Sequence, residues 1–254
     1  MKSCKQRLDV LLVKKGLAQS RQRAQGLILA GEVLVENEKL TKAGIQVPES
    51  ANIRLTGRGN PYVSRGGLKL EAALREFNIE VNGLRCLDVG ASTGGFTDCL
   101  LQHGAIHVTS VDVGYGQLHW KIRTDSRVYV LERTNIRYLH TDALKNTVDL
   151  TCIDVSFISL RIVVPAVLHF VKKTGTIICL IKPQFEVQKG LVGKNGVVRD
   201  PSLHQRVLEE LAETFYNLKL HQSSIIPSPI LGPKGNKEYL TVLRFEGSEI
   251  RVLG

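Results

Sequence analysis

The spacing of apolar residues divides the chain into short helices and strands. Apolar positions recur every three or four residues in some segments, which is typical of amphipathic helices. Short apolar runs and alternating apolar and polar residues predict strands elsewhere. Helices are predicted at residues 7–16, 21–30, 68–77, 96–103, 160–171 and 201–218. Strands are predicted at residues 32–36, 45–47, 53–55, 84–89, 107–111, 128–131, 148–153, 176–181, 225–230 and 239–245.

The order of these elements predicts two domains. Two short helices followed by small strands indicate a small α+β domain. Beyond it, strands alternate with helices, which predicts an α/β domain built on a parallel sheet, and the chain closes with an antiparallel hairpin. Glycine, proline and polar residues between the two patterns mark a linker. We place the first domain at residues 1–59, the linker at 60–65, the second domain at 66–246 and a tail at 247–254.

Positive charge is concentrated in the first domain. The whole chain has a formal net charge of +10, and residues 1–59 carry 11 lysines and arginines against 5 acidic residues. A small basic domain beside a nearly neutral one favours nucleic-acid binding, although an ordinary lysine-rich surface would also account for the surplus. The residues predicted to contact RNA are Arg7, Lys14, Lys15, Arg21, Arg23, Lys39, Lys42 and, after the linker, Arg65.

The remaining composition is that of a soluble globular protein. Hydrophobic residues make up 43% and charged residues 23% of the 254 residues. No apolar run approaches the roughly 18 residues of a membrane helix, and the first residues lack the apolar core of a signal peptide. The five cysteines form no C-x-x-C pair that would suggest zinc. We therefore expect a cytoplasmic protein with reduced thiols, no metal and no membrane contact.

A glycine-rich turn after the strand at 84–89 is the strongest candidate for a ligand site. Strand, turn and helix follow one another here, and such a turn offers free backbone N–H groups and close approach to the backbone. The next strand ends at Asp112, where a carboxylate can accept hydrogen bonds from both hydroxyls of a ribose. The pattern therefore predicts a nucleoside-containing cofactor at the carboxyl ends of a parallel sheet.

The order of the glycines narrows the choice of cofactor. Gly90, Gly94 and Gly95 do not fit the dinucleotide pattern G-x-G-x-x-G, and Asp88 suits a cationic ligand better than a pyrophosphate. The D-x-G-x-x-x-G-G order resembles the S-adenosylmethionine site of Rossmann-like methyltransferases. Another nucleotide enzyme, or a purely structural turn, would show similar features. The candidate cofactor residues are Asp88, Gly90, Ala91, Ser92, Gly94, Gly95, Phe96, Asp112, Asn135 and Asp154.

Four ionisable residues are expected at the same edge of the sheet. Asp154 and Lys182 end predicted strands, Glu238 begins the last one, and Lys69 lies in the first turn of a helix, where a cation is unfavourable. Pro183 is expected to prevent helical continuation and to hold Lys182 extended. Two lysines balanced by two carboxylates suit transfer of a methyl group to a hydroxyl, which needs help in losing its proton. Each residue taken alone would be an ordinary surface residue.

The motifs resemble known families over most of the chain. Residues 7–35, R-L-D-x-L-L-V-x-x-G-L-A-x-S-R-x-x-A-x-x-L-I-x-x-G-x-V-x-V, resemble the small RNA-binding domain first seen in a ribosomal small-subunit protein. Lys69, Asp154, Lys182 and Glu238 resemble the K-D-K-E tetrad of FtsJ/RrmJ-like ribose 2′-O-methyltransferases. With P-Y-V-S-R-G-G-L-K-L, I-D-V-S-F-I-S-L and L-I-K-P-Q-F-E, residues 5–246 resemble the TlyA family.

The resemblance implies a fold, an activity and roles for the tetrad. Members join an RNA-binding domain to a Rossmann-like, seven-stranded methyltransferase sheet, and they use S-adenosylmethionine to methylate cytidine 2′-hydroxyls in ribosomal RNA of one or both subunits. Lys182 would be the central catalytic lysine, supported by Lys69 and Glu238, with Asp154 near the methyl donor. We expect a monomer that acts on ribosomal subunits. This chain departs from some members in having Pro61-Tyr62 where they carry a tryptophan.

Two other functions remain as alternatives. A ribosome-assembly protein with an inactive catalytic domain would bind RNA without using the tetrad. Members of the family are often labelled haemolysins, but a membrane-lytic protein requires an apolar or strongly amphipathic surface, and the sequence shows none.

Overall fold

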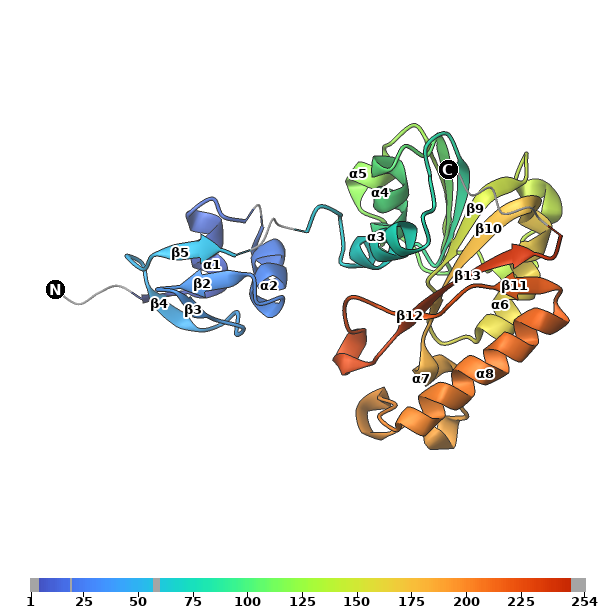
Figure 1. The fold of residues 1–254 in the computed structure, drawn as a ribbon. Coiled ribbons are helices and arrows are strands. Elements are labelled where there is room, and N and C mark those ends of the chain that lie inside the picture. The colour runs from blue at the N-terminus through green and yellow to red at the C-terminus, as the bar shows by residue number, and fades with distance from the viewer. Residues whose placement is uncertain (1–4, 19, 57–59, 248–254) are drawn as a thin grey trace. The chain divides into compact units, whose positions relative to one another are not determined.

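The structure, a computed structural model, describes residues 5–18, 20–56 and 60–247 (Figure 1). It divides the chain into two compact units, Met1–Pro61 and Tyr62–Gly254. The division falls inside the segment 60–65 that the sequence predicts as a linker. Residues 248–254 of the predicted tail, and Cys4, lie outside the described residues.

The first unit is a small α+β fold, as expected from its sequence. Leucine, isoleucine and valine side chains from both helices and from the strands form its core, with Leu8, Leu12 and Ile28 fully buried. Ser20 caps the second helix by accepting a hydrogen bond from the backbone N–H of Arg23 at 3.1 Å. The elements are β1 (Lys5–Arg7), α1 (Leu8–Lys14), α2 (Arg21–Leu29), β2 (Val33–Val35), β3 (Glu38–Lys39), β4 (Gln46–Pro48) and β5 (Ile53–Leu55).

The second unit is an α/β fold around one large sheet. Its strands are β6 (Arg85–Val89), β7 (His107–Val111), β8 (Val128–Leu131), β9 (Val148–Ile153), β10 (Val171–Ile181), β11 (Leu220–Gln222), β12 (Ile226–Pro227) and β13 (Tyr239–Phe245). Its α-helices are α3 (Gly66–Glu76), α4 (Gly95–Gln102), α5 (Trp120–Arg123), α6 (Leu160–Val167), α7 (Pro183–Glu186) and α8 (Pro201–Asn217). Short 3₁₀ turns lie at Ile136–Tyr138, Thr141–Ala143, Leu168–Phe170, Lys189–Leu191, Lys194–Gly196 and Pro233–Gly235.

The strands of this sheet follow the order β11-β13-β10-β9-β6-β7-β8, and β12 pairs with β13 outside that path. Strands β10, β9, β6, β7 and β8 are parallel, whereas β13 is antiparallel to its neighbours. The sheet is mixed and mostly parallel, as predicted, but it has eight strands rather than seven. The strand expected at 225–230 is reduced to β12, and β11 is additional. The carboxyl ends of β6, β7, β9 and β10 meet at one edge, which is where ligands bind in open α/β sheets.

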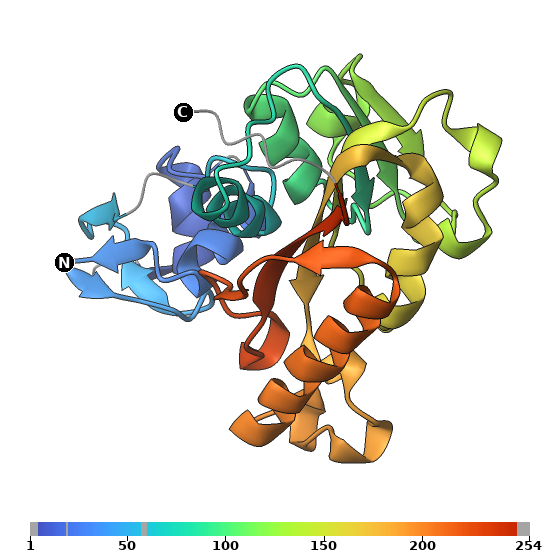
Figure 2. The same ribbon diagram turned by 45° about the vertical axis from the view of Figure 1, so that its right-hand side comes forward.

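Alternation along the strands separates two hydrophobic layers. Successive side chains of a strand point to opposite faces, so Cys86 and Cys152 pack toward α3 and α4, whereas Leu87 and Ile153 pack toward α6 and α8. Figures 1 and 2 show these helix pairs on the two faces of the sheet. The four described cysteines, at 86, 99, 152 and 179, are free and buried.

Three local predictions were wrong. Pro183 does not end helical structure but begins α7, because proline at the first position of a helix loses no hydrogen bond; Lys182 before it is extended, as expected. Strand β10 begins at Val171 rather than at 176, with an irregular register up to Thr176. The polar strands β1 and β11 were not predicted, since Lys5–Arg7 and Leu220–Gln222 lack an apolar alternation.

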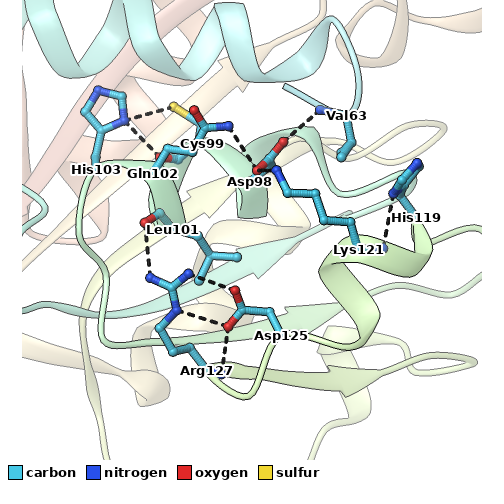
Figure 3. Close-up of polar contacts among 10 residues, drawn as sticks. All are labelled: Val63, Asp98, Cys99, Leu101, Gln102, His103, His119, Lys121, Asp125 and Arg127. Carbon is cyan, nitrogen blue, oxygen red and sulfur yellow. Dashed lines mark hydrogen bonds and ion pairs between the residues drawn. The ribbon is translucent and has the colours of Figure 1, made fainter. Parts of the chain in front are cut away.

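The first residues of the second unit, Tyr62 and Val63, are hydrogen-bonded to helices α3 and α4. The phenol of the buried Tyr62 donates to Glu71 at 2.9 Å, and the backbone N–H of Val63 donates to the buried carboxylate of Asp98 in α4 at 2.8 Å. Lys121 of α5 also pairs with Asp98, at 3.2 Å (Figure 3). Residues 62–63 of the predicted linker thus pack as part of the second unit.

Candidate active site

Two adjoining cavities open at the carboxyl ends of the parallel strands. The larger, about 740 Å³, extends from the end of β6 across β7 and past the start of α6. The smaller, about 340 Å³, lies among β6, the start of α3, Lys182 and the segment before β13. Gly90, Ser92, Asp154 and Ser156 line both cavities, so a ligand in the larger one can reach a group held in the smaller one.

Gly90 brings the turn after β6 against the neighbouring strand end. Its φ is +89°, and a Cβ at this position would lie 2.4 Å from the backbone oxygen of Asp154. Its N–H donates to the carbonyl of Val111 at 2.9 Å, which ties the turn to β7. Both the left-handed conformation and the lack of space therefore require glycine here.

Asp112 and Asn135 lie beside the larger cavity, as predicted, but both already hold backbone groups. The Asp112 carboxylate accepts hydrogen bonds from the N–H groups of Ser92 and Gly114, each at 2.7 Å. The Asn135 side chain accepts from the N–H of Arg137 at 3.1 Å. Each carboxylate oxygen keeps a further lone pair, so Asp112 can still accept from a ligand hydroxyl while its position is fixed.

The other candidate cofactor residues divide between lining and supporting positions. Ala91, Gly95 and Phe96 line the smaller cavity. Gly94 lines neither cavity and caps the start of α4 with φ +91°. Asp88 also lies outside both cavities: its side chain is fully buried and accepts a hydrogen bond from the Thr97 hydroxyl at 2.6 Å. The structure therefore places Asp88 and Gly94 behind the site rather than in it.

Burial raises the pKa of Asp88 to about 7, and the charges of Asp154 and Asp112 add to that rise against the opposing Thr97 hydroxyl. A carboxyl whose pKa is higher in the folded state favours folding at low pH and loses that contribution as the pH rises from about 4 to about 7. We expect Asp88→Asn to gain stability relative to the parent over this range, by up to about 4 kcal/mol. Urea unfolding at a series of pH values measures the difference.

Asp125→Asn is the matched control for Asp88→Asn. The hydrogen bond from Arg127 holds the pKa of Asp125 below its usual value, so this carboxylate stabilises the fold only when ionised (Figure 3). Its replacement should lose stability relative to the parent as the pH rises through its ordinary pKa. A stability difference for Asp88→Asn that stays constant from pH 4 to pH 8 would contradict the assignment.

The four predicted catalytic residues form two ion pairs at one cavity, of which Lys69–Glu238 is buried and Lys182–Asp154 is partly buried. Lys69 in α3 pairs with Glu238 at 2.5 Å, and Lys182 after β10 pairs with Asp154 after β9 at 2.6 Å. Lys182 also donates to the Ser156 hydroxyl at 3.1 Å. All four line the smaller cavity. Two cations and two carboxylates therefore face one small space, which can hold a hydroxyl and stabilise its oxygen.

Gly232 makes room for the Glu238 carboxylate. A Cβ on Gly232 would lie 2.0 Å from one Glu238 oxygen, and that oxygen is buried without a hydrogen-bond partner. Arg65, predicted to contact RNA, lines the same cavity and is exposed. A guanidinium thus lies at the entrance of the space that the two ion pairs enclose.

Sequence reasoning missed two residues that follow Asp154. Ser156 lines both cavities and binds Lys182, and Phe157 lines the larger cavity with 90% of its surface exposed and φ +64°. The Phe157 ring packs on Phe185 with centroids 4.9 Å apart. The sequence did contain a signal for them, a serine and an aromatic residue shortly after the acid that ends a strand. Phe157 was not singled out because it extends the apolar pattern of the neighbouring residues.

In the first unit, Asp9 holds two arginines and a glutamine. Its fully buried carboxylate accepts from Arg7 at 2.9 and 3.0 Å, from Arg21 at 3.0 Å and from Gln25 at 2.9 Å. The Arg7 hydrogen bond, with those of Gln25 and Arg21, holds the pKa of Asp9 well below its usual range against the effect of burial. About half of each arginine side chain remains exposed. Asp9 therefore fixes the two guanidinium groups while leaving them open to a ligand.

The other predicted RNA contacts of this unit differ in how they are held. Lys14 pairs with Glu49 at 3.1 Å, and Lys15 donates to the carbonyl of Ala51 at 3.0 Å. Lys39 and Lys42 are exposed, and Arg23 is partly buried. The structure brings Arg7 and Arg21 together on one carboxylate, whereas the sequence predicted only that both are basic.

We expect Asp9→Asn to weaken RNA binding by the full chain about tenfold, because the arginines lose their common acceptor. Removing a negative charge by itself would strengthen RNA binding, so a weakened complex identifies a positioning effect. Fluorescence anisotropy with a ribosomal RNA fragment measures the affinity. Glu49→Gln removes the same charge beside Lys14 and should bind at least as tightly as the parent. Tighter binding by both variants would show that Asp9 has no positioning role.

A parallel α/β sheet with a glycine turn and a buried lysine–carboxylate site at its carboxyl edge defines the class of Rossmann-like methyltransferases. Residues 62–245 match the family described as FtsJ-like methyltransferase, and residues 6–53 match the S4 domain. The chain belongs to the FtsJ-like methyltransferase family and, within it, to the group that contains the TlyA proteins. The predicted family and fold class are confirmed.

Relatives and solved structures agree with this assignment. The 16S/23S rRNA (cytidine-2′-O)-methyltransferase TlyA of Mycobacterium tuberculosis is 48% identical over 239 residues, which cover 94% of this chain and 89% of that protein. Hemolysin A of Brachyspira hyodysenteriae is 40% identical, covering 92% of this chain and 98% of that protein. A solved structure from Streptococcus thermophilus, provisionally designated a hemolysin, superposes with a TM-score of 0.75 at 40% identity, covering 97% of this chain and 92% of that one.

Two of the proteins named above carry hemolysin names. Within the parts of the chain that the structure describes, no helix combines the length and the apolar character needed to span a bilayer.

Proposed function

We propose that this protein transfers a methyl group from S-adenosylmethionine to the 2′-hydroxyl of a cytidine in ribosomal RNA. The observation that carries the proposal is the presence of two ion pairs, Lys69–Glu238 and Lys182–Asp154, at a cavity that adjoins a second one large enough for a nucleoside cofactor. The reaction and the target follow the names of the TlyA relatives, and they agree with the tetrad and the S4 domain.

The larger cavity fits S-adenosylmethionine. Its volume of about 740 Å³ suits a ligand of that size, and the close approach at Gly90 leaves backbone free of side-chain atoms. Asp112 would accept hydrogen bonds from the ribose of the cofactor, and Asn135 would contact its adenine. When bound, S-adenosylmethionine supplies a methyl group on a positively charged sulfur. Asp154, which lines both cavities, would lie beside that charge.

The smaller cavity fits the target hydroxyl. We assign Lys182 to hold the hydroxyl oxygen and to stabilise it while the oxygen bonds to the methyl carbon. The bond from that carbon to sulfur would break, leaving a neutral thioether, and the hydroxyl proton would pass to water. Asp154 and Ser156 fix the Lys182 ammonium group from two sides. Glu238 fixes Lys69 across the cavity, and together the carboxylates balance both cations. These contacts within the protein restrict the positions of both lysines.

Two features at the opening suit an RNA target. Arg65 lies at the entrance of the smaller cavity and can bind a phosphate beside the methylated nucleotide. The exposed Phe157 ring at the larger cavity can stack on a base that is displaced from an RNA helix. The basic face around Arg7 and Arg21 in the S4 domain would bind the RNA at a second place.

The test is methyl transfer with purified components. The protein is incubated with tritiated S-adenosylmethionine and separated small and large ribosomal subunits, and modified riboses are mapped by primer extension at low dNTP concentration. Label on a cytidine ribose supports the proposal and names the subunit. Cofactor binding without transfer to either subunit would refute ribosomal RNA as the target, and failure to bind the cofactor would refute the enzyme class.

A further inference from the structure

A third cavity in the second unit lies outside the site described above. It has a volume of about 630 Å³ and is formed by the segment before α8, the first turns of α8 and the segment before β13. Its lining contains three exposed cations and no acidic side chain. We call it the basic pocket; its charged and polar lining residues are Arg199, His204, Gln205, Lys234, Lys237 and Tyr239.

The cations of the basic pocket are not neutralised within the protein. Arg199, Lys234 and Lys237 form no ion pair with any of the residues that the structure describes. Other cations of this unit, such as Lys69 and Lys182, do have carboxylate partners. Three like charges around one hollow repel each other unless an anion binds there. The pocket therefore fits a polyanion.

The walls of the basic pocket are held in place by buried polar groups. The buried Asn236 side chain accepts from the N–H of Val198 at 3.3 Å and donates to the carbonyl of Gly196 at 3.0 Å, which joins the two segments that carry the cations. On the floor, His204 bonds to the Val198 carbonyl at 2.9 Å and to the Tyr239 hydroxyl at 3.0 Å. These hydrogen bonds within the protein fix the walls of the basic pocket.

A single chain segment separates the basic pocket from the catalytic cavity. Gly232, Pro233 and Glu238 line the catalytic cavity. Lys234, Lys237 and Tyr239, from the same segment, line the basic pocket. Because successive residues of an extended strand point to opposite sides, Lys237 and Tyr239 face one hollow while Glu238 faces the other. A strand of nucleic acid that leaves the catalytic cavity over this segment enters the basic pocket.

We propose that the basic pocket binds the sugar–phosphate backbone of the RNA strand that carries the methylated nucleotide. The proposal rests on the proposed function, because it takes the RNA in the catalytic cavity as its starting point. Arg199, Lys234 and Lys237 neutralise phosphates, and the contact fixes the direction in which the strand crosses the segment before β13. The pocket is a contact of the methyltransferase domain itself, separate from the S4 domain.

The test compares the full-length double variant Lys234→Ala/Lys237→Ala with the control Lys173→Ala/Lys219→Ala. The control removes two lysines that lie at the start of β10 and after α8, at the opposite edge of the sheet from the catalytic residues. We expect the double variant to raise the KM for ribosomal subunits about tenfold. The salt dependence of its binding to a labelled oligocytidylate should also weaken, with the slope of log K against log salt reduced by about 1 to 2. The control should match the parent in both.

The outcomes separate this proposal from the proposed function. If the parent methylates a subunit and the double variant has the KM and the salt slope of the control, the basic pocket does not bind the RNA, and an acidic protein surface becomes its candidate occupant. If the parent methylates neither subunit, the proposed function fails. The salt slope with oligocytidylate then still tests whether the basic pocket binds RNA, and an unchanged slope in the double variant would contradict that binding. Lys234→Glu/Lys237→Glu, in which both exposed side chains change sign, should show the larger loss.

Discussion

Lys182→Ala is expected to lower the rate of methyl transfer by at least about 100-fold while the affinity for S-adenosylmethionine changes little. Lys182 is buried at the smaller cavity, and its ammonium group is the point where the ion pair with Asp154 and the hydrogen bond to Ser156 meet. Removing it leaves the target hydroxyl without the group that we propose stabilises its oxygen. Single-turnover transfer of tritium to ribosomal subunits, with cofactor binding measured by calorimetry, separates the two effects.

Lys182→Met is the companion to this variant, because it keeps the length of the side chain and removes only the charge. It should be as inactive as Lys182→Ala, whereas Lys173→Ala, at the opposite end of the same strand, should retain parental activity. Full activity in either Lys182 variant would remove this residue from the mechanism. Loss of activity accompanied by loss of the folded state would instead assign Lys182 a structural role.

Gly90→Ala is expected to destabilise the second unit by on the order of 3 kcal/mol and to abolish cofactor binding. The added methyl group would lie 2.4 Å from the Asp154 backbone oxygen, so the turn after β6 has to move away from β9. That movement changes the surface that both cavities share. Urea unfolding measures the stability, and calorimetry measures the affinity for S-adenosylmethionine.

Gly83→Ala provides the control for Gly90→Ala. Gly83 also has a positive φ, +78°, but an added Cβ would meet no atom within 4 Å. This substitution should cost only the conformational strain, about 1 kcal/mol, and leave cofactor binding intact. If the two alanine variants were equally stable and both bound the cofactor, the close approach of Gly90 to the Asp154 backbone would not be required for cofactor binding.

The strand-end residues of the site could be predicted because an apolar run ends just before each of them. Gly90, Asp112, Asp154 and Lys182 directly follow β6, β7, β9 and β10, and parallel strands bring their carboxyl ends together. The same alternation indicates which face of the sheet Asp88 belongs to. It lies two residues after Cys86, which packs toward α3 and α4, so Asp88 faces those helices and not the open edge.

Other features of the site depend on contacts that no local pattern contains. Lys69 and Glu238 are separated by 169 residues, and the sequence placed them at one edge without showing that they pair with each other. Gly232 belongs to a turn whose role, making room for Glu238, exists only once the segment before β13 has folded back. In the first unit, the convergence of Arg7, Arg21 and Gln25 on Asp9 likewise requires both helices to be packed.

The pairing of the catalytic charges has a consequence for how the protein responds to ionic strength. Lys69 with Glu238, and Lys182 with Asp154, form a locally neutral centre in a chain with a net charge of +10. Dissolved ions screen exposed charges over about 10 Å at 0.1 M, but they act weakly on buried pairs. We therefore expect salt to weaken RNA binding by the proposed basic surfaces while it has little effect on the chemical step at the centre. Substrate recruitment and catalysis respond to different variables of the cellular environment.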